Sequence, residues 1–220
     1  MMKALIFDMD GLMVDTERLY FAVEKELARS FGREVSEETL RRMMGRKPLE
    51  SLILFRQELG LEATPEELLA LRTKLMRQKI AHDLRPMPGL YTIVSVFARR
   101  LKLAIATGAQ QEFLDLIIDQ LSLRSKFAVL QASDEVKQGK PHPEIYDLTC
   151  AKLGFRPAEC IVLEDSANGV IAGRRAGCYV IAIPSLYSQG GDFSQAQAIV
   201  SDLFSAIPLI EKLLTSDLKN

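Results

Sequence analysis

The stretch Lys3-Ala4-Leu5-Ile6-Phe7-Asp8-Met9-Asp10-Gly11 decides the fold. Its apolar run, Ala4 to Phe7, stops at an acid, and a short continuous apolar run is typical of a strand buried on both faces of a parallel sheet. Asp8 then lies at the carboxyl end of that strand, where open α/β sheets bind their ligands. Asp10 is two residues further on, so it lies on the same side if the chain stays extended.

Two carboxylates this close together repel each other unless something neutralises them. A divalent hard cation does so, and Mg²⁺ typically takes one or two carboxylates together with substrate phosphate oxygens. Alternatively, one carboxylate keeps its proton, as a general acid requires. A solvated turn at the end of the strand, where Asp and Gly are common, is the purely structural alternative.

Composition and charge narrow the class of protein. The 220 residues are 48% hydrophobic and 26% charged, which indicates a globular protein of one large domain or of a domain with an insertion. The net charge of -1 argues against nucleic-acid binding. Since no apolar run approaches the roughly 20 residues that span a bilayer, we expect no membrane partner. Asp8 and Asp10 also interrupt any signal-peptide core.

The cysteine and histidine content points to a cytoplasmic protein without zinc. Three cysteines form no CxxC pair, so the sequence predicts small buried hydrophobes in a reducing cytoplasm: Cys150, Cys160 and Cys178. With only two histidines, His82 and His142, a histidine-rich zinc site is not expected.

The chain changes character at Pro86-Met87-Pro88-Gly89. Before this point, residues 16–82 predict only helices, and Thr64-Pro65-Glu66-Glu67 carries the capping-box signature of a helix start. After it, apolar runs that predict strands alternate with helical segments. The predicted strands are 103–106, 127–130, 160–163, 179–183 and 198–200.

Alternating strands and helices predict a doubly wound parallel sheet that is covered on both faces. The helical block interrupts this pattern directly after the first strand. We therefore expect an α/β core formed by residues 1–14 and 87–220, with an all-α helical cap, residues 15–86, inserted into it.

Polar side chains follow several of the predicted strands. Thr107 and Gly108 follow one strand, Lys140 precedes a helix, and Glu164 and Asp165 follow another strand. Each feature alone has an ordinary explanation as a turn, a loop or a helix cap. Because the carboxyl ends of the strands meet at one edge of a doubly wound sheet, the combination predicts phosphoryl transfer, with Mg²⁺ joining the acids to a phosphate.

The order Asp8-x-Asp10-Gly11, Thr107, Lys140 and Glu164-Asp165 resembles the four motifs of the haloacid dehalogenase (HAD) superfamily of hydrolases. The resemblance extends from Ile6 to Ile183. The helical insertion is similar to the cap of the β-phosphoglucomutase and sugar-phosphatase branch. The resemblance implies a HAD-like Rossmannoid core.

The resemblance also implies a role for each matching residue. Asp8 would be the nucleophile that forms an aspartyl-phosphate, and Asp10 the general acid and then the base. Thr107, Gly108 and Lys140 would bind the phosphoryl group. The metal site would comprise Asp8, the backbone carbonyl of Asp10, and Asp165, with Glu164 close by or acting through water. Since a carbon–halogen branch needs no proton donor at Asp10, dehalogenation is not the expected reaction.

Substrate choice is expected in the cap, in the segment Met44 to Leu52. Mutases of this branch carry an arginine there that grips a second phosphate, and the alignment places Pro48 at that position. Arg46 and Lys47 are the candidate substrate-binding residues, although a solvated loop explains them equally well.

We therefore expect a monomeric, cytoplasmic, Mg²⁺-dependent phosphatase that acts on a small phosphorylated metabolite, plausibly a sugar phosphate. A phosphosugar mutase is the alternative enzyme. A phospho-receiver signalling module is the non-enzyme alternative, but such modules are short and carry their phosphorylated aspartate on a middle strand.

Overall fold

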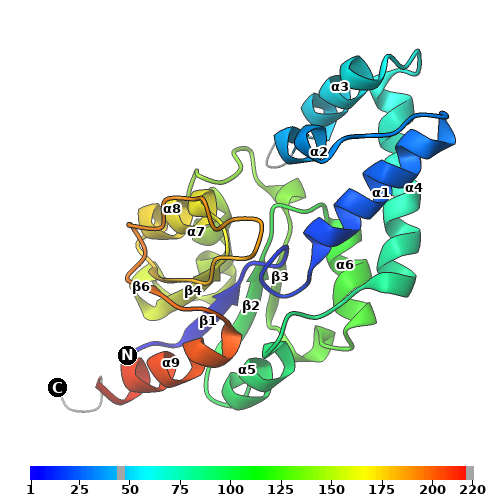
Figure 1. Ribbon diagram of the computed structural model, residues 1–220. Coiled ribbons are helices and arrows are strands. Elements are labelled where there is room, and N and C mark those ends of the chain that lie inside the picture. The colour runs from blue at the N-terminus through cyan, green and yellow to red at the C-terminus, as the bar shows by residue number, and fades with distance from the viewer. Residues whose placement is uncertain (44–47, 217–220) are drawn as a thin grey trace. The chain divides into compact units, whose positions relative to one another are not determined.

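A computed structural model describes residues 1–43 and 48–216 of the chain (Figure 1). The chain forms two compact units, one comprising Met1–Asp15 and Arg85–Asn220 and the other Thr16–Leu84. The helical unit begins one residue later and ends two residues earlier than the cap of residues 15–86 that the sequence predicts. The reason is that the two connecting segments pair: the Asp15 N–H donates to the Arg85 carbonyl at 3.1 Å, and the Met87 N–H to the Met13 carbonyl at 2.8 Å.

The first unit is built on a six-stranded parallel sheet. Its strands are β1 (Ala4–Phe7), β2 (Lys102–Ala106), β3 (Val129–Gln131), β4 (Cys160–Glu164), β5 (Tyr179–Ala182) and β6 (Ala198–Ile199). Their order is β3-β2-β1-β4-β5-β6. The chain runs outward from β1 in one direction and later returns to add β4 on its other side. The switch in direction between β1 and β4 is where doubly wound sheets bind ligands.

Helices cover the sheet on both faces, as the apolar strands require. They are α5 (Leu90–Phe97), α6 (Gln111–Gln120), α7 (Glu144–Leu153), α8 (Ala167–Ala176) and α9 (Leu203–Ser216). Helix α7 packs against β2 and β3, and α8 against β4, β5 and α7, while α5 packs against α9. Every second strand residue, such as Ile6, is buried against α7 and α8. The residues between them, such as Leu5 and Phe7, are equally buried.

Three short 3₁₀ turns join these elements: Arg124–Lys126, Ser133–Glu135 and Pro157–Glu159. The first of them explains why the third strand begins two residues later than the sequence predicts. The Phe127 N–H closes that turn on the Arg124 carbonyl, so the chain meets β2 only from Ala128, whose N–H donates to the Leu103 carbonyl at 2.8 Å. The strand ends at Gln131, whose carbonyl accepts from the Thr107 N–H at 3.0 Å.

The second unit consists of helices α1 (Thr16–Ser30), α2 (Glu37–Met43), α3 (Pro48–Leu59) and α4 (Pro65–Asp83). Its apolar core includes Leu27, Leu52, Phe55 and Leu68. The predicted capping box forms at α4: the Glu67 N–H donates to the Thr64 hydroxyl at 3.2 Å, and the Thr64 N–H donates to the Glu67 carboxylate at 2.8 Å. Within the described parts of both units, no helix has the length and apolar character to cross a membrane.

Candidate active site

The carboxyl ends of β1, β2 and β4 bring the predicted site residues of the first unit together. Phe7 pairs with Ile105 of β2 on one side and with Leu163 of β4 on the other. Asp8 follows directly, and its N–H donates to the Leu163 carbonyl at 3.0 Å. The parallel register therefore places Asp8, Thr107 and Glu164 at the same edge of the sheet, as the sequence predicts.

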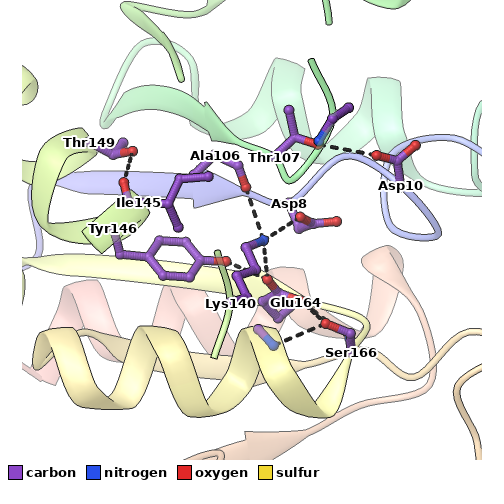
Figure 2. Close-up of polar contacts among 12 residues, drawn as sticks. Asp8, Asp10, Ala106, Thr107, Lys140, Ile145, Tyr146, Thr149, Glu164 and Ser166 are labelled. Atoms are coloured by element: carbon purple, nitrogen blue, oxygen red, sulfur yellow. Dashed lines mark hydrogen bonds and ion pairs between the residues drawn. The ribbon is translucent and has the colours of Figure 1, made fainter. Parts of the chain in front are cut away.

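Lys140 lies at the centre of this edge (Figure 2). Its Nζ donates to Asp8 Oδ1 at 2.5 Å, to Glu164 Oε1 at 2.5 Å and to the carbonyl of Ala106 at 3.2 Å. The lysine side chain is 12% exposed, and the Glu164 side chain is fully buried. A lysine at this point joins two acidic strand ends and stays just within reach of solvent.

The charged groups at this edge shift one another's pKa values. Burial opposes the charge on Lys140, but the carboxylates of Asp8 and Glu164 outweigh it and hold the pKa of Lys140 well above its usual value. Burial raises the pKa of Asp8, which Lys140 opposes and the nearby carboxylates reinforce. One ammonium group is therefore too little positive charge for the acids around it.

Three carboxylates form a group suited to a metal ion. Oxygens of Asp8, Glu164 and Asp165 all lie within 4.8 Å of one another, and all three residues are buried. A Cβ at position 11 would overlap the Asp165 carboxylate, so Gly11, with φ +76°, leaves the space that this carboxylate fills. Burial, reinforced by the Glu164 charge, raises the pKa of Asp165 to about 7. An all-oxygen, negatively charged donor set fits a hard divalent cation such as Mg²⁺.

The side chain of Asp10 contacts Thr107 (Figure 2). The Thr107 hydroxyl donates to Asp10 Oδ2 at 3.2 Å and accepts from the Ala109 N–H at 3.0 Å. Gly108, which lies between Thr107 and Ala109 in the sequence, is exposed. A Cβ at this position would meet no atom within 4 Å. Packing therefore does not require glycine at position 108.

The sequence did not mark several residues that hold the acids in place. Tyr146 donates from its hydroxyl to Glu164 Oε1 at 2.5 Å, and the Ser166 hydroxyl donates to Glu164 Oε2 at 3.0 Å. The Ser188 hydroxyl donates to the Asp165 carbonyl at 2.6 Å, and Ser185 bonds the Asp165 side chain. Ser166 also caps helix α8, since its hydroxyl accepts from the Gly169 N–H at 3.1 Å.

The predicted substrate-binding residues Arg46 and Lys47 lie outside the described residues. The structure therefore brings together Asp8, Lys140, Glu164 and Asp165 in one cluster, and the Asp10–Thr107 pair beside it.

Several known proteins are similar to this chain in sequence or in fold. The "Phosphorylated carbohydrates phosphatase" of Thermotoga maritima is 36% identical over 177 residues, which cover 80% of this chain and 82% of that protein. The "Fructose-1-phosphate phosphatase YqaB" of Escherichia coli is 28% identical, over 79% of this chain and 92% of its own. A solved candidate β-phosphoglucomutase from Thermotoga maritima superposes with a TM-score of 0.83 at 31% identity, covering 96% of this chain and 99% of that one.

A family model described as haloacid dehalogenase-like hydrolase matches residues 5–183, from the first strand to the end of β5. This range includes the acid pair after β1, the threonine after β2, the lysine before α7 and the acids after β4. The chain therefore belongs to the haloacid dehalogenase-like hydrolase family.

Proposed function

We propose that this chain is a Mg²⁺-dependent phosphatase that hydrolyses a small phosphorylated metabolite, of the sugar-phosphate class, through an aspartyl-phosphate on Asp8. The observation that carries the proposal is the position of the Asp8 carboxylate, which is bonded to Lys140 and grouped with Asp165 and Glu164. Relatives that are named as phosphatases of phosphorylated carbohydrates and of fructose 1-phosphate support the substrate class.

The metal would be held by Asp8, Asp165 and the backbone carbonyl of Asp10, with Glu164 beside it. When bound, it neutralises excess carboxylate charge and polarises the phosphoryl oxygens. Lys140 supplies a fixed positive charge beside Asp8, which favours an incoming phosphate and the negative charge that develops during transfer. The carboxylate of Asp8 attacks phosphorus, and the bond to the leaving alkoxide breaks.

Asp10 would give its proton to the leaving oxygen and then take a proton from the water that hydrolyses the aspartyl-phosphate. The Thr107 hydroxyl supports both steps because it bonds Asp10 Oδ2 and fixes the direction of that carboxyl group. The helical unit and its Arg46 and Lys47 remain our candidates for selecting the substrate.

A panel of phosphate monoesters, assayed for phosphate release with and without Mg²⁺, tests the proposal. Asp8→Asn should reduce turnover by at least about 1,000-fold, because a neutral amide cannot serve as the nucleophile. Asp119→Asn, at an exposed aspartate of α6, is the matched control and should leave turnover unchanged. Equal turnover in Asp8→Asn, or no release from any ester by the unmodified chain, would contradict the proposal.

Phosphosugar mutase is the second candidate, because the chain superposes closely on a candidate β-phosphoglucomutase of 31% identity. Pro48, the first residue of α3, stands against it, since the resemblance places a phosphate-gripping arginine there in mutases. Isomerisation of a hexose phosphate, primed with a sugar bisphosphate, separates the two. Release of inorganic phosphate without the isomer favours the phosphatase.

A further inference from the structure

Tyr146 is a fully buried residue of α7 that the proposed chemistry does not use. Its ring lies beside the Lys140 ammonium, 5.1 Å from Nζ to the ring centroid, and its hydroxyl donates to Glu164 Oε1 at 2.5 Å (Figure 2). Burial and the Glu164 charge raise the pKa of Tyr146 well above its usual value, so the phenol keeps its proton. Packing alone would be satisfied by phenylalanine, so the hydroxyl needs another explanation.

Glu164 is held from all sides. Its Oε1 accepts from Lys140 and Tyr146, and its Oε2 accepts from the Ser166 hydroxyl at 3.0 Å and the Ser166 N–H at 3.3 Å. An ionised carboxylate has about four lone-pair sites, and these four bonds occupy them. A Cβ at position 169 would overlap the carboxyl group, so Gly169 provides the space in which it lies.

We propose that Tyr146 is a positioning residue, which fixes Glu164 so that this carboxylate anchors the Lys140 ammonium beside Asp8 instead of ligating the metal directly. The inference rests on the proposed phosphatase function and deepens it, because it divides the acids into two roles. Asp8 and Asp165 would hold the metal, whereas Glu164 would hold only the lysine, which Asp8 also contacts. Without the phenol, Oε1 would be held by Lys140 alone, and the lysine would lose part of its fixed placement.

Tyr146→Phe tests this assignment, because it removes one oxygen and keeps the buried ring. We expect kcat to fall about tenfold, because the lost bond is a hydrogen bond to a charged carboxylate, while KM and the Mg²⁺ concentration at half-maximal rate stay within twofold. Thr149→Val is the matched control. It removes a buried hydroxyl from the same helix, where Thr149 bonds the Ile145 carbonyl at 2.7 Å, and it should leave kcat unchanged.

A double-mutant cycle separates positioning from a general loss of stability. If Tyr146 acts through Glu164, Tyr146→Phe should cost less than twofold in a Glu164→Gln background. A loss of the same size in both backgrounds, or an unchanged kcat in the single variant, would overturn the inference. Gly169→Ala is a second variant that displaces Glu164 from the opposite side, and it should show the same fall in kcat at an unchanged Mg²⁺ requirement.

Calorimetric Mg²⁺ binding gives a readout that needs no substrate. Tyr146→Phe should bind Mg²⁺ with unchanged affinity, whereas a tenfold loss would show that Glu164 ligates the metal and would overturn the assignment. Failure of the proposed function looks different: the unmodified chain would then release no phosphate, whatever its affinity for Mg²⁺.

Discussion

Both units of the chain bury a basic side chain against acids, but the ratio of charges differs. In the α/β unit one lysine, Lys140, faces three buried carboxylates: Asp8, Glu164 and Asp165. In the helical unit Arg72 bonds a single acid, Glu24, at 3.3 Å, and the Ser51 hydroxyl at 3.0 Å. Excess negative charge needs a cation from outside the chain, whereas a one-to-one pair carries no excess charge.

The Arg72–Glu24 pair of the helical unit is therefore a structural link among three helices. Arg72 lies on α4, Glu24 on α1 and Ser51 on α3, whose hydroxyl also donates to the Pro48 carbonyl at 2.8 Å. Burial raises the pKa of Glu24, and Arg72 opposes the shift. Among the described residues, Glu24 Oε2 has no hydrogen-bond partner, which shows that this cluster is not fully satisfied.

The largest expected effect comes from removing one of the three carboxylates of the α/β unit. Asp165→Asn removes one metal ligand, and since outer-shell changes already cost about 10–100-fold in metal affinity, it should raise the Mg²⁺ requirement by at least about 100-fold. The fold should persist, because a buried charge with raised pKa disappears. Calorimetry measures the affinity, and a wild-type Mg²⁺ affinity would remove Asp165 from the metal site. Asp192→Asn, at an exposed loop aspartate, is the control.

The second prediction breaks the balanced pair. Arg72→Met leaves the Glu24 carboxylate buried and unpaired, which should destabilise the helical unit by about 3 kcal/mol. Adding Glu24→Leu should restore most of this loss, because an apolar pair replaces a partly satisfied ionic one. Chemical denaturation monitored by circular dichroism measures both.

The matched control for this pair is Arg42→Met. Arg42 contacts Glu58 at 2.9 Å, but both side chains are at least 36% exposed, so the change should cost no more than about 1 kcal/mol. Equal losses in Arg42→Met and Arg72→Met would contradict the comparison between exposed and buried pairs.

Local chemistry accounts for what the sequence predicted well. The apolar run that ends at Asp8 specifies a buried strand, and the capping box at Thr64 specifies a helix start, so both are visible over a few residues. Asp8 and Asp165 were predicted because strand ends in a doubly wound sheet converge whatever the loops between them do, whereas Lys140 was predicted from its place before a helix and from the order of the motifs.

The residues that the sequence did not reveal depend on three-dimensional register. Tyr146 reads locally as one more apolar residue of a core helix, and only the packing of α7 against the sheet brings its hydroxyl to Glu164. Ser188 lies 23 residues after Asp165 in a loop without a recognisable motif, so its bond to the Asp165 carbonyl leaves no sequence signal. Supporting contacts are therefore harder to predict than the groups they support.

A third, smaller effect sharpens the role of the polar pair beside the carboxylate cluster. Thr107→Val removes the hydroxyl that bonds Asp10 Oδ2 and keeps the shape of the side chain. Hydrogen bonds to charged groups contribute about 1.5–3 kcal/mol, so kcat should fall about tenfold or more. Thr107→Ser, which keeps the hydroxyl, should recover most of the rate in the same steady-state assay. A valine variant with full kcat would show that Asp10 needs no such partner.

The smallest effect concerns the pH dependence of stability that the carboxylate cluster of the α/β unit produces. In the metal-free protein the pKa of Asp165 is raised to about 7 and that of Asp8 is also raised, both mainly by burial. The folded state then binds more protons than the unfolded state between the unfolded pKa, near 4, and about 7, so stability falls as pH rises through this window. With EDTA, we expect Tm to drop between pH 5 and pH 7.5, by about 2–4 °C for each kcal/mol lost. Mg²⁺ should reverse the drop, and Asp165→Asn should flatten it. A rise in Tm over the same range in EDTA would mean that Lys140 already neutralises the carboxylates. It would contradict the inference that the cluster needs a cation from outside the chain.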